Sequence, residues 1–212
     1  MNKKKWAVDL FLLFVKITGL FPALLLFKPR VTWVGNNRKL PATCILVSNH
    51  RSLMDFALYL LVFPFRTIRF LMAEVLFNKS KLFAWFLRAM GGIRVDRDSF
   101  QFGFVADSIQ VLEKGGTLGV FPEGRLPIGG RPFPFTPSTA FIATKVPQVP
   151  IVPVYTDGNY GLLKRAGVVI GEPIYLADFM QEGLTESEQL KHLTEVLEQK
   201  VRGLGEYIKK GK

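Results

Sequence analysis

Short apolar runs alternate with amphipathic stretches along most of this chain, and each pattern predicts one kind of element. The run 43–47 is β-branched and apolar without alternation, which is typical of a strand buried on both faces. Similar runs predict further strands, and apolar residues at helical spacing predict helices between them. The predicted strands are 31–34, 43–47, 68–73, 93–95, 117–121, 149–155 and 168–170, and the predicted helices are 52–62, 75–90, 99–114, a short one after Pro137 and a final one capped by Thr185 and Glu188.

This order of elements predicts an α/β fold. Strands joined through helices by right-handed crossovers lie parallel in one sheet, with helices on both of its faces. We therefore expect residues 29–212 to form one domain with a mainly parallel central sheet flanked by helices, and 212 residues are enough for a sizeable core. In the last helix, His192 lies opposite the apolar stripe and is expected to be solvated.

Residues 1–28 follow a different pattern and are expected to form a hydrophobic, membrane-associating helical segment. The apolar stretch from Trp6 to Phe27 is long enough to span a bilayer. Three charged residues, Lys5, Asp9 and Lys16, share one side of this helix, however. Gly19 and Pro22 also interrupt it. A broken helix or helix pair lying in the membrane interface accounts for these features best. A transmembrane span, a signal peptide and a buried core helix are the alternatives.

The composition is both apolar and basic. Hydrophobic residues make up 49% of the chain, and 28 Lys and Arg against 17 Asp and Glu give a net charge of +11. This combination favours an anionic membrane surface, and no recognised nucleic-acid-binding motif accompanies the charge, so no nucleic-acid partner is expected. Cys44, the single cysteine, excludes a disulfide framework and indicates a reducing compartment.

Candidate chemistry begins where the strand 43–47 ends. His50 lies in the following turn, and Asp55 opens the next helix. Loops at the carboxyl ends of strands carry the chemistry of open α/β sheets, so Asp55 could orient the His50 imidazole and stabilise its protonated form. Ser52 and Asp55 also form a variant of the capping box, so the carboxylate could instead serve backbone amides alone.

Two more loops follow strand ends and are expected at the same edge of the sheet. They contain Asp96-Arg97 and Glu123-Gly124-Arg125. A His–carboxylate pair beside arginines suits transfer to a hydroxyl of a phosphorylated compound, because the imidazole takes the proton and guanidinium groups bind phosphate. The His and carboxylate residues lack the spacing of metal ligands, so no metal is expected.

Four short blocks carry a distinctive pattern. They are N-H-R-S-L-M-D at 49–55, G-I-R-V-D-R at 92–97, F-P-E-G at 121–124 and V-P-I-V-P-V at 149–154. In order and spacing they resemble the glycerolipid acyltransferases typified by 1-acylglycerol-3-phosphate acyltransferase, which acylate lysophosphatidic acid to phosphatidic acid.

The resemblance implies a role for each block. His50 would be the general base on the acceptor hydroxyl, and Asp55 its orienting partner. The donor would be an acyl thioester, either acyl-CoA or acyl carrier protein, with no other cofactor. The residues expected to bind the acceptor are Asn49, Ser52, Arg94, Arg97, Glu123, Gly124 and Arg125.

Two positions depart from the family pattern. The family has Thr and then Arg after F-P-E-G, whereas Arg125 follows directly here. Thr136-Pro137-Ser138 stands where many relatives carry F-K-x-G. Both changes concern the acceptor side, so they bear on the headgroup more than on the reaction.

The sequence therefore predicts a membrane-bound acyltransferase on the cytoplasmic face, monotopic or peripheral, that makes phosphatidic acid from lysophosphatidic acid. Transfer to another lysolipid or to glycerol-3-phosphate, and hydrolysis by a thioesterase, are alternatives with the same donor. A non-catalytic membrane-binding module is a further alternative, but it gives no reason for His50, Asp55 and Glu123 to gather at strand ends. Acyl-chain length and oligomeric state stay open.

Overall fold

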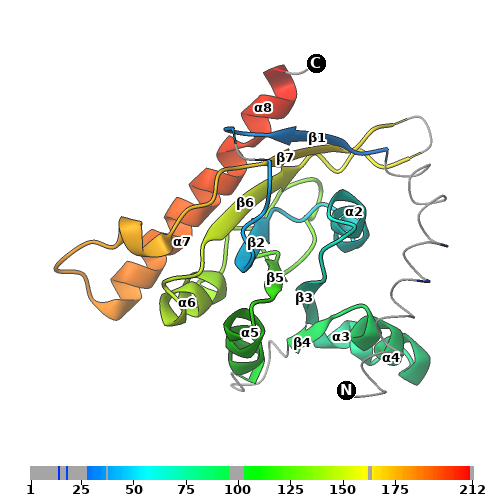
Figure 1. Cartoon of the computed structure of the whole chain (residues 1–212), viewed down its shortest axis with the longest axis horizontal. Coiled ribbons are helices and arrows are strands. Elements are labelled where there is room, and N and C mark those ends of the chain that lie inside the picture. Colours follow the sequence, from blue (N-terminus) through cyan, green and yellow to red (C-terminus); the bar gives the residue numbers. More distant parts are fainter. Residues whose placement is uncertain are drawn as a thin grey trace.

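The computed structural model describes Phe14, Thr18 and residues 28–36, 38–95, 103–161 and 164–210. Within these residues, seven strands form one sheet in the order β1-β7-β6-β2-β5-β3-β4 (Figure 1). Every neighbouring pair is parallel except β6 and β7. The strands are β1 (Arg30–Trp33), β2 (Cys44–Ser48), β3 (Ile68–Ala73), β4 (Ile93–Val95), β5 (Thr117–Val120), β6 (Ile151–Thr156) and β7 (Gly167–Ile170).

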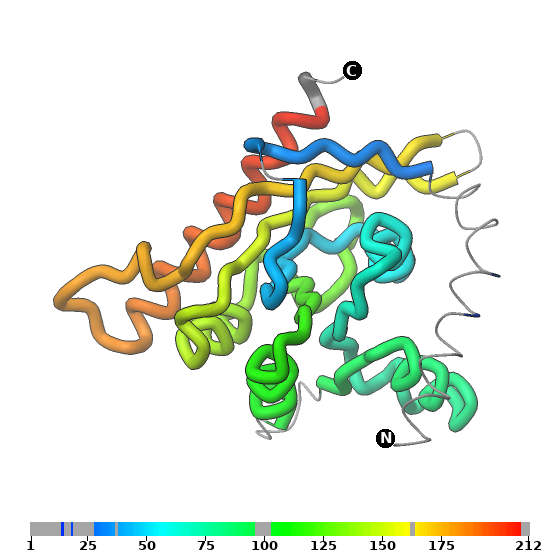
Figure 2. The backbone as a smooth tube through the Cα atoms, in the orientation of Figure 1, coloured from blue at the N-terminus to red at the C-terminus, as the bar shows by residue number. Residues whose placement is uncertain are grey.

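Helices cover both faces of this sheet, so the expected α/β architecture with a mainly parallel sheet is confirmed. Figures 1 and 2 show α2, α3 and α4 on one side and α5, α6 and α7 on the other. The helices are α2 (Asp55–Val62), α3 (Glu74–Phe77), α4 (Lys81–Ala89), α5 (Gly103–Glu113), α6 (Ser138–Lys145), α7 (Glu186–Gly203) and α8 (Gly205–Lys210), with a 3-10 helix, η1 (Leu176–Phe179).

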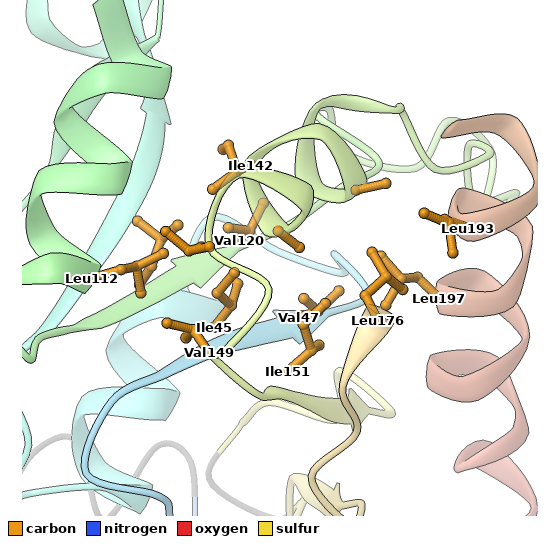
Figure 3. Close-up of a cluster of buried hydrophobic side chains, with 14 of the residues drawn as sticks. Ile45, Val47, Leu112, Val120, Ile142, Val149, Ile151, Leu176, Leu193 and Leu197 are labelled. Carbon is orange, nitrogen blue, oxygen red and sulfur yellow. The ribbon is translucent and has the colours of Figure 1, made fainter. Parts of the chain in front are cut away.

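The central strand β2 explains why the core has two halves. All five of its residues are buried, as the unbroken apolar run predicts. Ile45 and Val47 point to the face covered by α5, α6 and α7 (Figure 3), whereas Cys44 and Leu46 point to the face covered by α2, α3 and α4. Because apolar side chains cover both faces of β2, the strand is held in one position within the sheet. The loop after it therefore leaves the sheet at a defined place.

Three local predictions differ from the structure. The expected helix 75–90 is two helices, because Ser80 caps α4 by accepting a hydrogen bond from the Phe83 N–H at 3.1 Å. The expected helix 52–62 begins only at Asp55, and Met54 at its N-cap makes no side-chain cap bond. The prediction that His192 is solvated is wrong: it is half-buried, with Nε2 3.1 Å from the Phe179 carbonyl oxygen.

The last helix also differs, because the expected single helix is α7 followed by α8. Its predicted start is confirmed, since Thr185 and Glu188 form a complete capping box. Gly205 opens α8 beside Tyr155, where an added Cβ would lie 3.1 Å from the phenol ring. The C-terminal helices therefore approach the end of β6 closely.

The N-terminal segment 1–28 falls almost entirely outside the described residues, so its helical form and the division of the chain at residue 28 stay predictions. In the part of the chain that the structure describes, none of the helices has the length and hydropathy that crossing a bilayer requires.

The parallel strands bring three loops to one edge. Val47 pairs with Val120 of β5, and Ser48 pairs with Val154 of β6, so these three strands end at similar depth. The loops that follow β2, β5 and β6 therefore leave the sheet side by side. The loop after β4, which carries Asp96 and Arg97, lies outside the described residues.

Candidate active site

His50 and Asp55 meet directly at the carboxyl end of β2. His50 Nδ1 lies 2.7 Å from Asp55 Oδ2. The His50 side chain is 16% exposed and that of Asp55 is 0% exposed. Nε2 makes no hydrogen bond to the described residues, so the nitrogen that faces away from Asp55 is the one able to accept a proton.

The Asp55 carboxylate binds both the imidazole and backbone amides. It therefore combines the two roles that the sequence offered as alternatives. Oδ2 also accepts hydrogen bonds from the N–H groups of Arg51, at 2.7 Å, and Ser52, at 2.9 Å. The Tyr160 hydroxyl donates to Oδ1. Four donors around a fully buried carboxylate offset the cost of removing its charge from water.

The His50 ring stacks on a column of aromatic residues. Its centroid lies 4.4 Å from that of Phe121, with 16° between the planes. Phe121 in turn stacks on Phe70 at 5.7 Å. Phe70 fits there because Gly119 has no side chain: an added Cβ would lie 2.4 Å from the Phe70 ring. The aromatic residue of F-P-E-G thus forms one wall against the imidazole.

Glu123 supports the backbone at His50. Its Oε1 accepts a hydrogen bond from the His50 N–H at 3.2 Å, and the residue is 2% exposed. Burial raises the pKa of Glu123, against the opposing effects of the His50 N–H and the Arg202 charge. Gly124 continues the turn with φ +65°, a conformation that favours glycine. The sequence-based assignment of both residues to the acceptor pocket stays a prediction.

Asn49 and Ser52 are also used within the fold. Asn49 Nδ2 donates to the Thr156 carbonyl at 2.9 Å, and the Thr156 N–H donates to Asn49 Oδ1 at 2.8 Å. This pair ties the end of β2 to the end of β6. Ser52 Oγ accepts from the Met54 N–H at 3.2 Å. These contacts position the His50 turn, whatever else the two side chains bind.

The three arginines that were expected to bind the acceptor differ in their placement. Arg94 forms an ion pair with Glu74 at the start of α3, and its side chain is 47% exposed. The exposed Arg125 guanidinium stacks over the Phe133 ring, 4.9 Å from its centroid. Neither arginine has an interaction with His50 or Asp55 within the described ranges, and Arg97 lies outside them.

Sequence reasoning missed a polar pocket of about 190 Å³ next to the His50 backbone. Arg51 lies at its wall and donates to the Tyr155 hydroxyl at 3.0 Å, while its Nε is buried without a partner among the described residues. The residues that line the pocket are Asn49, Arg51, Glu123, Pro132, Tyr155, Arg202, Gly205 and Glu206. Two guanidinium groups and two carboxylates balance in formal charge, so this pocket is not simply cationic.

Tyr160 was also missed, because it lies outside all four blocks. The one local signal is the turn-forming sequence Asp157-Gly158-Asn159 after a predicted strand. Cys44, by contrast, is buried as expected, and desolvation raises the pKa of its thiol to about 11. In the described parts of the chain, no group of three or more His, Cys, Asp or Glu residues is arranged to hold a metal ion.

Comparison with known proteins adds a family context. The family model described as Acyltransferase matches residues 30–157. The chain is 29% identical over 182 residues to 1-acyl-sn-glycerol-3-phosphate acyltransferase BAT2, chloroplastic, of Brassica napus, covering 77% of this chain and 52% of that protein. It is 30% identical over 112 residues to the Homo sapiens 1-acyl-sn-glycerol-3-phosphate acyltransferase beta, covering 52% of this chain and 40% of that protein. The chain thus spans about half the length of the curated relatives that it matches.

A solved structure shares the fold. The crystal structure of the 1-acyl-sn-glycerophosphate (LPA) acyltransferase PlsC from Thermotoga maritima aligns with a TM-score of 0.66 and 26% sequence identity. The alignment covers 98% of this chain and 83% of that one. The matched region of the family model includes His50, Asp55 and Glu123 and ends at Asp157, three residues before Tyr160.

Proposed function

Because this chain belongs to the acyltransferase family, we propose that it transfers a fatty acyl group from an acyl thioester to the free hydroxyl of 1-acylglycerol-3-phosphate, giving phosphatidic acid. The observation that carries the proposal is the contact of the buried Asp55 carboxylate with His50 Nδ1, which leaves Nε2 available as a base. The activities for which the similar proteins are named support the choice of acceptor.

The proposed reaction uses the His50 imidazole in two proton transfers. Nε2 takes the proton from the acceptor hydroxyl as its oxygen attacks the thioester carbonyl carbon. The tetrahedral intermediate then collapses, the carbon–sulfur bond breaks, and the imidazolium returns the proton to the leaving thiolate. Asp55 holds the Nδ1–H tautomer and stabilises the imidazolium between these steps. No side chain of the enzyme is acylated in this scheme.

Recognition of the substrates is a separate part of the proposal. The donor is acyl-CoA or acyl carrier protein, and no other cofactor takes part. Arg97 is proposed as the main phosphate ligand because it ends the second block. Arg125 occupies the Thr position of the family pattern and stacks on Phe133, so we assign it a smaller share.

Membrane association is proposed for residues 1–28 together with one face of the folded domain. Helices α3 and α4 expose three large apolar side chains: Val75 is 66%, Leu82 74% and Trp85 51% exposed. Lys79 and Lys81 are exposed beside them. Apolar side chains next to lysines suit the boundary of an anionic bilayer, where apolar atoms enter the acyl region and charges stay at the headgroups.

The test of the proposed activity is product analysis with the purified full chain. Lysophosphatidic acid, other lysolipids, glycerol-3-phosphate and a reaction without acceptor are each combined with acyl-CoA and with acyl carrier protein, and products are read by mass spectrometry. We expect phosphatidic acid as the main product, and none from the His50→Ala variant. Release of free fatty acid at the same rate with and without acceptor would identify a thioesterase instead.

A further inference from the structure

The loop between β6 and β7 places a tyrosine hydroxyl on the candidate catalytic carboxylate. We propose that Tyr160 is a positioning residue for acyl transfer, which holds Asp55 in the orientation that keeps Oδ2 on His50 Nδ1. The proposal rests on the proposed function in one respect, namely that His50 is the base. Tyr160 itself acts through Asp55 and contacts no reacting atom in this scheme.

The division of contacts between the two Asp55 oxygens gives the hydroxyl its role. Oδ2 receives the imidazole and two backbone N–H groups. Among the described residues, Tyr160 supplies the hydrogen bond to Oδ1. Because the Asp55 side chain is 0% exposed, solvent does not reach Oδ1 to replace that donor. Loss of the hydroxyl would leave a buried, charged oxygen unsatisfied, and the carboxylate would lose the contact that fixes its rotation.

Three features build the loop that carries Tyr160. Asp157 links the two ends of the loop, because Asp157 Oδ1 accepts hydrogen bonds from the N–H groups of Asn159, at 3.0 Å, and Gly167, at 2.9 Å. Gly158 has φ +69°, and an added Cβ would lie 2.7 Å from the Arg51 Cβ. The Tyr160 N–H then donates to the Gly158 carbonyl at 2.9 Å. The loop therefore fits against the His50–Asp55 turn at a point where no larger residue can stand.

The chemistry of the phenol suits a donor rather than a base. Burial raises the pKa of Tyr160, and the nearby Asp55 charge raises it further, so the hydroxyl keeps its proton. A neutral donor on Oδ1 draws part of the carboxylate charge away from the imidazole. Without it, more of that charge acts on the Nδ1–H group of His50. Removing the hydroxyl should therefore change the environment of the imidazole.

The kinetic test compares Tyr160→Phe with Tyr175→Phe, which removes a hydroxyl from a tyrosine that is 45% exposed and outside the site. A hydrogen bond to a charged group corresponds to about 10-fold to 100-fold in an equilibrium or rate. We expect Tyr160→Phe to lower kcat by about tenfold or more, with KM for both substrates changed by less than about twofold. In an Asp55→Asn background the same change should cost nothing further, because the effect passes through Asp55.

A second measurement does not depend on turnover. The chain has two histidines, so selective isotope labelling gives two imidazole signals, and a His192→Gln variant assigns them. We expect the His50 imidazole signal to change position in Tyr160→Phe and to stay unchanged in Tyr175→Phe. This result would support the contact even if the enzyme proved inactive toward lysophosphatidic acid, so failure of the contact and failure of the proposed function can be told apart.

A folded Tyr160→Phe variant with wild-type kcat would overturn the proposal, whether or not the His50 signal moved. If that variant does not fold, Gly158→Ala carries the same test, since it displaces the loop while keeping the hydroxyl. It should then reproduce the loss in kcat and the changed position of the His50 signal, and wild-type behaviour of both quantities would contradict a positioning role.

Discussion

The imidazole of His50 lies flat against the ring of Phe121, with centroids 4.4 Å apart and 16° between the planes. This contact joins the first and third sequence blocks, which are about 70 residues apart along the chain. Phe70 continues the stack behind Phe121, and Gly119 makes room for it. The orientation of the imidazole is therefore set from two directions, by a carboxylate at Nδ1 and by an aromatic wall at its face.

Gly119→Ala tests this wall. The new Cβ would lie 2.4 Å from the Phe70 ring, so Phe70 and the stack above it must shift. We expect the free energy of unfolding to fall by about 1–3 kcal/mol and kcat to fall as the imidazole is displaced. Gly103→Ala in α5 is the matched control, because its Cβ would meet no atom within 4 Å. Unfolding by urea and steady-state kinetics measure both variants; equal behaviour would rule out a role for the stack.

His50→Ala and Asp55→Asn test the base and its partner. General-base catalysis contributes about 10²-fold to 10⁴-fold, so we expect losses of that order in kcat for both variants, with cooperative unfolding retained. If Asp55 only bound the backbone amides of this turn, the substitution would instead lower the free energy of unfolding by about 1 kcal/mol and leave the rate almost unchanged. A loss of less than about tenfold in either variant would contradict the assignment.

Glu123→Gln tests whether Glu123 supports the His50 backbone. Burial raises the pKa of this carboxyl, so the native state holds the proton more tightly than the unfolded chain. The contribution of Glu123 to stability is therefore largest at low pH and is lost as pH rises through its raised pKa. The variant keeps an acceptor for the His50 N–H, and its unfolding free energy should exceed that of the parent at about pH 8 and approach it at about pH 4. Urea unfolding at several pH values measures this difference, and a gap that widens toward low pH would show the opposite sign.

Arg97→Lys and Arg125→Lys compare the two proposed phosphate ligands. Lysine keeps the charge but loses the planar two-point contact of a guanidinium. For Arg97→Lys we expect a raised KM for lysophosphatidic acid, and for Arg125→Lys a smaller change, because Arg125 is stacked on Phe133. Wild-type enzyme that acylates acceptors with and without a phosphate equally well would refute the phosphate assignment while leaving the His50 chemistry intact.

The membrane face on α3 and α4 is tested by replacing Leu82 and Trp85 with serine in one variant. Burying these two side chains in the interface stabilises binding by a few kcal/mol. Binding to phosphatidylglycerol vesicles should therefore weaken by about tenfold or more in this variant. Ile128→Ser removes a comparably exposed apolar residue from another surface, since Ile128 is 71% exposed, and should bind as the parent does. Sedimentation with vesicles measures the affinity; equal weakening in both variants would show that position on α4 is irrelevant.

Much of this protein could be predicted from local sequence. Element type follows from the spacing of apolar residues. The predicted strand 68–73 has the bounds of β3, and the predicted strand 43–47 differs from β2 by one residue at each end. His50 and Asp55 meet because a tight turn separates them by only five positions. Such features depend on chain period, turn residues and caps, which a short window of sequence contains.

Other features required the tertiary structure. Tyr160 reaches Asp55 across 105 positions, and the half-buried site of His192 depends on the 3-10 helix η1, which ends at Phe179. The antiparallel pairing of β7 with β6, and the place of β7 between β6 and β1, likewise depend on how the chain returns to the sheet. Residue type and period alone do not encode such contacts, because they are decided by how separate elements pack. The local sequence thus determined the strands, the helices and the His50–Asp55 turn, and packing decided which distant side chains complete the site.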